Sequence, residues 1–294
     1  MQLLAGFCFL LVTFLWGTFY SVTKEALERI DPIIFAFLET SMTLPFAIGV
    51  LIWNRKKLFY ELWKSGIVLG FLLYLNLLTA AIALAHTTAT NTAFFPSING
   101  IIVTVMAWLM KKNNISLATW VAGLFSLLGT ILLITSHSSF HGQWRGDLIA
   151  LLAPLFYACY IFRIDYDTRG STQTLWPLIG IELITLCFLC GITAFFFSDW
   201  SHFDPDFPKD FYVIGYVGLL TTLFPVIVST LLQKYLSPIS VAFIFILEPI
   251  WGTIIAAIYL GEKLNFIGYL GGSLIILASM LNTLSSSRRQ QTTI

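Results

Sequence analysis

The chain has 294 residues, of which 57% are hydrophobic and 11% are charged, and its formal net charge is +1. Soluble domains carry about 25% charged residues, so a water-soluble protein of this size could not hide so much apolar surface in its core. The near-zero net charge offers no broad basic surface, so no nucleic acid partner is expected. The composition predicts a membrane protein whose outer surface contacts the lipid bilayer.

Ten stretches of the chain are apolar over the roughly 20 residues that a helix needs to cross a bilayer core. Helices are expected rather than barrel strands, because a helix satisfies its own backbone hydrogen bonds and these runs are too long for strands. The first stretch lacks the basic start and cleavage site of a signal peptide, so we interpret it as a membrane helix. The predicted spans are Leu3–Val22, Ile33–Trp53, Gly66–Ala85, Ala89–Met110, Leu117–Ser136, Asp147–Asp165, Leu175–Phe197, Tyr212–Leu232, Ile239–Leu260 and Ile267–Leu284.

The distribution of Lys and Arg predicts the orientation. An even number of helices puts both termini on one side, and the loops and tail of that side hold eleven of these residues against five on the other. Cytoplasmic loops are enriched in Lys and Arg. We therefore predict a multi-pass protein of the cell (inner) membrane with both termini in the cytoplasm.

Part of the sequence recurs in its second half. Ala93-Phe94 precedes Asn99, and 149 residues later Ala242-Phe243 precedes Glu248. Together with a second match, this recurrence suggests two homologous halves.

The second match relates Leu15-Trp16-Gly17 to Phe156-Tyr157-Ala158, displaced by 141 residues. With five helices per half, the second half enters the membrane from the opposite side, as in transporters whose halves rock about a site at the midplane. The predicted fold class is an all-α membrane protein with ten transmembrane helices in two inverted five-helix repeats. These repeats are residues 1–140 and residues 141–294, the second with a short cytoplasmic tail.

Three motifs resemble known transporters. Leu15-Trp16-Gly17 is followed by Lys24, Asp31-Pro32 opens the second predicted helix, and Leu247-Glu248-Pro249 precedes Leu260-Gly261-Glu262. The chain thereby resembles the drug/metabolite transporter superfamily, specifically its EamA-like branch. The resemblance implies ten helices, inverted repeats and carriage of amino acids, amines or other small metabolites, often outward.

The chain also departs from the family pattern. Glu39 stands where the family usually has an Arg in the second helix. The first half has Asn99-Gly100 and Asn113-Asn114 where the repeat of its motif would carry a Pro and a Gly-Glu. The charge pattern of the pore therefore differs from the family average, and family substrates do not transfer directly.

Three glutamates, Glu39, Glu182 and Glu248, fall within predicted helices. An ionisable group inside the bilayer is costly, so each invites a functional hypothesis. We predict that all three could couple transport to protons, and that Glu39 and Glu248 contact the substrate. The alternative for each is a hydrogen bond that holds two helices together.

Aromatic and amide side chains at membrane depth complete the predicted site. Ring faces could hold an organic cation, and amides could line a cavity, although core packing and contact between helices are the alternatives. Prolines within the spans, notably Pro225 and Pro249, suggest kinks that gating could use. The predicted substrate-binding residues are Glu39, Glu248, Trp16, Tyr20, Asn76, Asn99, Tyr157 and Trp251.

The sequence contains no P-loop, HExxH or paired Asp motif, so neither ATP-driven transport nor an enzyme is expected, and no catalytic residue, metal or cofactor is assigned. We predict a secondary transporter that moves a small polar metabolite by alternating access. The metabolite is amino-acid-like, an amine or another cationic or zwitterionic compound, and the movement is coupled to protons or a gradient, in the direction of export.

Two other functions remain open. One is a membrane receptor or assembly subunit that moves nothing, and the other is an importer of a nucleotide-like metabolite. Small residues on the last helix suggest close packing within the chain or a homodimer face: Gly268, Gly271, Gly272 and Ser273.

Overall fold

The structure is a computed structural model that describes residues 1–23, 25–86, 95–110, 115–136, 149, 151–171, 175–259 and 265–292. These residues are almost entirely helical, and no strand occurs among them. The predicted all-α architecture is confirmed. The main helices are α1 (Gln2–Thr23), α2 (Pro32–Ser41), α3 (Leu44–Trp53), α4 (Tyr60–His86), α6 (Asn99–Leu109), α7 (Leu117–Ser136), α9 (Leu152–Thr168), α10 (Trp176–Phe197), α11 (Lys209–Tyr216), α12 (Phe224–Leu232), α13 (Pro238–Phe245), α14 (Glu248–Tyr259) and α15 (Phe266–Thr292).

Length and hydropathy confirm seven of the ten predicted spans among the described residues. Two of the remaining three coincide with the shorter apolar helices Pro96–Leu109 and Leu117–Leu132. The third is α9, whose second half carries Arg163, Asp165 and Asp167 and is therefore less apolar.

Prolines divide several of the spans, as the sequence indicates. The second span consists of α2 and α3, because Pro45 lacks the N–H that the Ser41 carbonyl would accept in a continuous helix. The ninth span consists of α13 and α14, and Pro249 deprives the Phe245 carbonyl in the same way. In the eighth span, a π-helical turn (η5, Val217–Leu223) joins α11 to α12 just before Pro225.

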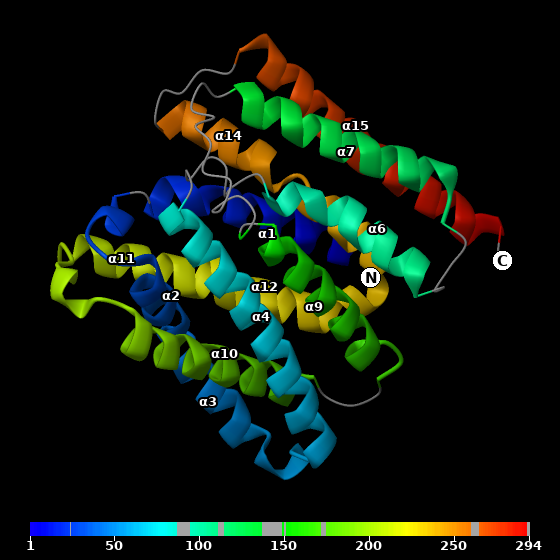
Figure 1. Cartoon of the computed structure of the whole chain (residues 1–294). Coiled ribbons are helices and arrows are strands. Elements are labelled where there is room, and N and C mark those ends of the chain that lie inside the picture. The colour runs from blue at the N-terminus through cyan, green and yellow to red at the C-terminus, as the bar shows by residue number, and fades with distance from the viewer. Residues whose placement is uncertain are drawn as a thin grey trace.

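The two halves make reciprocal contacts. The first helix of the chain, α1, packs against α12 and α14, and its equivalent in the second half, α9, packs against α4 and α6. The equivalent helices α7 and α15 lie side by side and run in opposite directions (Figure 1). These pairings are those of two repeats related by an inverted two-fold arrangement.

Both termini lie at the same end of the bundle in Figure 1. We call this the terminal end. The opposite end, which we call the far end, carries the turn that joins α1 to α2 and the start of α11. On α15, the Gly271 carbonyl packs against Gly129 of α7, so part of the small-residue run serves packing within the chain. The homodimer stays a prediction.

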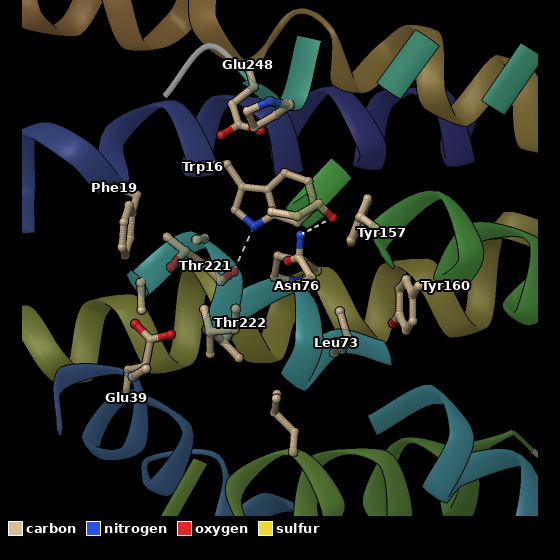
Figure 2. A pocket seen from close by; sticks show the side chains of 18 of the residues that line it. Trp16, Phe19, Glu39, Leu73, Asn76, Tyr157, Tyr160, Thr221, Thr222 and Glu248 are labelled. Carbon is tan, nitrogen blue, oxygen red and sulfur yellow. Dashed lines mark hydrogen bonds between the residues drawn. The ribbon is translucent and has the colours of Figure 1, made fainter. Parts of the chain in front are cut away.

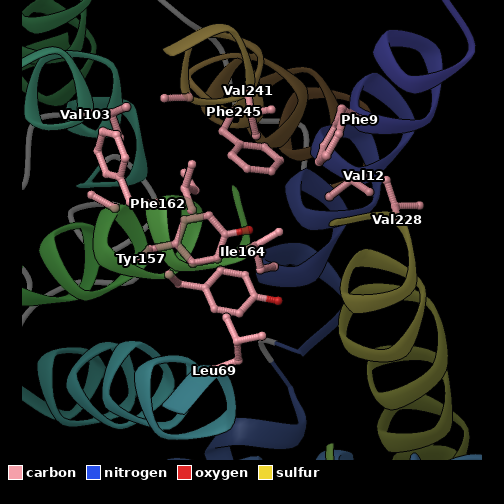
Figure 3. Close-up of a cluster of buried hydrophobic side chains, with 14 of the residues drawn as sticks. Phe9, Val12, Leu69, Val103, Tyr157, Phe162, Ile164, Val228, Val241 and Phe245 are labelled. Atoms are coloured by element: carbon pink, nitrogen blue, oxygen red, sulfur yellow. The ribbon is translucent and has the colours of Figure 1, made fainter. Parts of the chain in front are cut away.

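A cluster of buried side chains lies between helices of both halves (Figure 3). Most of the helix stretches that contribute to it lie nearer the terminal end in Figure 1. Its members come mainly from α1, α4, α6, α9, α10, α12 and α13, and both halves contribute. Apolar side chains packed this closely exclude water and polar solutes. The cluster therefore seals the interior on the terminal side, with Phe9, Val12, Leu69, Val103, Ile164, Val228 and Val241 among its members.

Two glycines allow helices of opposite halves to approach closely. A Cβ at Gly218 would overlap sterically with the Glu39 carbonyl oxygen. A Cβ at Gly70 would lie 2.5 Å from the Glu182 carbonyl oxygen, which is also too close. These neighbours are main-chain atoms, which cannot move aside for an added methyl group as the end of a flexible side chain can. These contacts fix the backbone around both glutamates.

We expect Gly218→Ala to destabilise the protein by about 1–3 kcal/mol, the usual cost of overpacking. Gly215→Ala is the matched control, because it lies one turn earlier in the same span and a Cβ there would meet nothing within 4 Å. Thermal unfolding of both variants in detergent checks the expectation. Equal unfolding temperatures would show that the close approach is not tight.

Candidate functional site

A cavity of about 220 Å³ lies between the two halves (Figure 2). The main helices that meet there are α1, α2, α4, α6, α9, α10, α12, α13 and α14, together with η5. The structure brings six of the predicted substrate-binding residues to the wall of the cavity. Tyr20 lies in α1, and its side chain is outside the described part of the structure. The six are Trp16, Glu39, Asn76, Asn99, Tyr157 and Glu248.

Local sequence explains why Glu39 faces the cavity. The Asp31 carboxylate caps the start of α2 by accepting from the Ile33 N–H at 2.8 Å, and Pro32 occupies the first helical position. The helix then runs only to Ser41, so Glu39 lies in its last turn beside the break. The side chain is 2% exposed, and its Oε2 atom has no hydrogen-bond partner among the described residues.

Asn99 shows the same feature. It begins α6, is 3% exposed, and its Oδ1 atom has no hydrogen-bond partner among the described residues. A buried oxygen without a partner costs free energy unless a ligand or water satisfies it. Glu39 and Asn99 therefore offer acceptor atoms to whatever occupies the cavity.

Glu248 lines the cavity from the side of the second half. It is the first residue of α14, directly after the break in the ninth span, and is 5% exposed. The dipole at a helix N-terminus favours a negative charge. The position therefore suits a carboxylate.

Three aromatic rings form one side of the cavity. The centroid of Trp16 lies 4.9 Å from that of Phe245 and 5.6 Å from that of Tyr157. The Trp16 Nε1–H also donates to the Thr221 carbonyl at 2.8 Å, an acceptor that Pro225 leaves without its usual helical donor. The ring of Trp16 is thereby held in place across the interface of the two halves.

Phe245 and Tyr160 also belong to this wall, although neither is among the predicted substrate-binding residues. Tyr160 could have been found, because it stands three residues after the predicted Tyr157 in the same helix, a spacing typical of one helix face. No comparable signal points to Phe245, because it ends α13 whereas Glu248 begins α14.

Two other predicted residues do not line the cavity. Trp251 packs α14 against α1, where its Nε1–H donates to Thr13 Oγ1 at 3.2 Å and its ring meets Phe14 edge to face. Glu182 is fully buried behind Tyr160, whose hydroxyl donates to Glu182 Oε1 at 2.6 Å. In this conformation both residues hold helices together.

The cavity is acidic. It is lined by Glu39 and Glu248, and no Lys, Arg or His is among its described lining residues. At the far end, Arg29 is engaged elsewhere, because its Nη2 and Nε donate to the Asp210 carboxylate at 2.7 and 3.1 Å. These hydrogen bonds raise the pKa of the Arg29 guanidinium, so its charge is permanent but directed at Asp210. Lys24, which the sequence places near this end, lies outside the described residues.

A two-repeat helical membrane protein with a central, mostly apolar cavity that holds two glutamates has the architecture of a transporter. Comparisons with known proteins agree: the model of the EamA-like transporter family matches the chain twice, over residues 3–135 and 144–284. The chain belongs to the EamA-like transporter family, as its motifs suggest, and it is a membrane transporter.

Two relatives support this assignment, and a solved structure shares the fold. Two proteins of Archaeoglobus fulgidus, each described as an uncharacterized transporter, are 25% and 26% identical to the chain. Each match covers 93% of this chain, and they cover 84% and 95% of the relatives. A crystal structure with 14% identity superposes with a TM-score of 0.76 over 97% of this chain and 98% of the other, which shows a shared fold.

Proposed function

We propose that this protein is a secondary transporter of a small metabolite that carries a positively charged amine. The observation that carries the proposal is the charge of the cavity, whose described wall holds two glutamates and no basic residue. A carboxylate in a water-poor site binds an ammonium through a charge-assisted hydrogen bond. The aromatic wall of Trp16, Tyr157 and Phe245 adds ring faces that attract cations.

The unpaired acceptors support the same class of ligand. Glu39 Oε2 and Asn99 Oδ1 both need hydrogen-bond donors, and an ammonium group carries only donors. An anionic, nucleotide-like substrate would place negative charge beside Glu39 and Glu248. The cavity therefore favours the amine over the nucleotide-like alternative.

The position of the cavity supports alternating access. Phe19, Leu27 and Pro32 line it toward the far end, whereas most of the buried apolar cluster lies nearer the terminal end. Rocking of the two similar halves would close the cavity at the far end and open it at the terminal end. With cytoplasmic termini, export would begin from the opposite conformation and release the substrate through the one described here.

A thermal-shift screen tests the binding step. A ligand that binds only the folded protein raises its unfolding temperature. We expect primary amines to raise it, and carboxylic acids of the same carbon skeleton to have no effect. A shift with the acids but not the amines would contradict the proposed substrate class.

The orientation is a separate prediction. Single cysteines placed at Gln291, in the last turn of α15, should react with a membrane-impermeant thiol reagent only after the cells are opened. The reason is the excess of Lys and Arg on the terminal side. Labelling of intact cells from outside would reverse the assigned sides of the membrane, and with them the direction of transport.

A further inference from the structure

Glu182 and Glu39 occupy equivalent places in the two halves. Each lies on the second span of its half, Glu39 on α2 and Glu182 on α10. The main-chain carbonyl of each meets a glycine on the third span of the opposite half: Gly218 meets Glu39, and Gly70 meets Glu182. The two glutamates therefore follow the same two-fold relation as the helices around them.

The hydrogen bonds of their carboxyl groups differ. The Glu182 carboxyl accepts from the Tyr160 hydroxyl at 2.6 Å and from Thr230 Oγ1 at 3.4 Å, whereas Glu39 Oε2 has no partner among the described residues. The 141-residue displacement that matches Trp16 with Tyr157 also matches Phe19 with Tyr160. Phe19 has no hydroxyl to donate.

Figure 2 shows the consequence in space. Phe19 and Glu39 lie on one side of the cavity, and Tyr160 lies on the other. Both aromatic residues line the cavity. The acid toward the far end is thus open to a ligand, while its equivalent is covered by a side chain that donates to it.

We propose that Glu182 is a second cation-binding site on the transport path, equivalent to Glu39 and occupied in this conformation by the hydroxyls of Tyr160 and Thr230. The inference rests on the proposed function. Two hydroxyl donors on one carboxyl reproduce the hydrogen bonds that a primary ammonium would make there. When the halves exchange conformations, Tyr160 withdraws, the cavity reaches the terminal end, and the ammonium takes the place of the hydroxyl.

The difference between Phe19 and Tyr160 also sets the preferred conformation. The Tyr160–Glu182 hydrogen bond stabilises closure of the terminal end, and Phe19 offers no matching bond for closure of the far end. Tyr160→Phe should therefore shift the protein toward opening at the terminal end. Phe19→Tyr, the reciprocal variant, should place a hydroxyl near Glu39 and shift the protein toward closure of the far end.

Thiol accessibility tests the site without requiring transport. Single cysteines are introduced as Ala36→Cys, one turn before Glu39 on the cavity wall, or as Thr230→Cys, beside Glu182, after the four native cysteines are replaced by alanine. The probes are a trimethylammonium thiosulfonate reagent and its anionic sulfonate counterpart, neither of which crosses a bilayer. Each is applied separately to the two sides of reconstituted vesicles.

We expect the Ala36→Cys thiol to react from the far-end side and the Thr230→Cys thiol from the terminal side only, both faster with the cationic probe. Tyr160→Phe should raise the reaction rate of the Thr230→Cys thiol about tenfold, because it removes one hydrogen bond to a buried acid. Glu39→Gln and Glu182→Gln should each erase the preference for the cationic probe at the neighbouring thiol. The acids are then cation-attracting sites on opposite sides of one path.

A Thr230→Cys thiol that stays unreactive from the terminal side, with and without Tyr160→Phe, while the Ala36→Cys thiol reacts, would overturn the second site and leave the proposed function intact. Reaction of the Thr230→Cys thiol from the far-end side would equally overturn it, because Glu182 would then belong to the present cavity. If neither thiol reacts from any side, the proposed function fails, and the second site with it.

Discussion

Glu39→Gln is expected to reduce amine transport by about tenfold to a hundredfold while the protein folds normally. A hydrogen bond to a charged group contributes about 1.5–3 kcal/mol, which corresponds to that range of affinity. Glu39 Oε2 has no partner among the described residues, so the substitution removes charge without breaking a bond at this atom. Uptake of a radiolabelled amine into proteoliposomes measures the effect.

Two controls separate the loss of charge from a loss of fold. Glu61→Gln changes an exposed glutamate in the first turn of α4 and should leave uptake unchanged. The unfolding temperature of Glu39→Gln should stay near that of the wild type. Uptake by Glu39→Gln that equals the wild type at every pH would contradict a charged role for this residue.

Glu248→Gln is expected to flatten the dependence of substrate affinity on pH. A cationic substrate favours the carboxylate form of Glu248, so binding and loss of the proton are coupled, and each promotes the other by the same factor. For the wild type, affinity should therefore rise with pH until the free acid is fully deprotonated. The glutamine variant cannot titrate at this position.

The measurement is amine affinity across a pH series for wild type and Glu248→Gln. Glutamine is preferred to alanine, because alanine would also leave a cavity at the start of α14 and could loosen the ninth span. Superimposable pH curves for the two proteins would assign Glu248 a structural role. The titrating acid would then be sought at Glu39.

Seven of the ten spans and the broken helices were predictable from the sequence, because apolar length and proline act locally. Pro249 removes one backbone donor wherever the helix lies, so the break beside Glu248 follows from the sequence alone. The acids at membrane depth were also predictable, since their types stand out against apolar neighbours. Of these, Glu39 and Glu248 reach the cavity.

The partner of each side chain was not predictable, because it depends on how helices distant in sequence rotate and pack. Trp251 and Glu182 look like cavity residues in the sequence. In the structure, Trp251 donates a hydrogen bond to Thr13, and Glu182 accepts one from Tyr160. Helical periodicity places a residue on a face of its own helix and says nothing of what that face meets. The hydrogen bonds from Tyr160 and Thr230 to Glu182 depend on how α9, α10 and α12 pack together.

Counterflow of a radiolabelled primary amine in proteoliposomes tests the central claim most directly. Vesicles are loaded with an unlabelled amine that raises the unfolding temperature, and entry of the labelled amine is followed. We predict that the wild-type protein accumulates label transiently above the level of protein-free vesicles and that Glu39→Gln does not. Wild-type vesicles indistinguishable from protein-free ones, for every amine that the protein binds, would contradict the account and indicate a receptor that moves nothing.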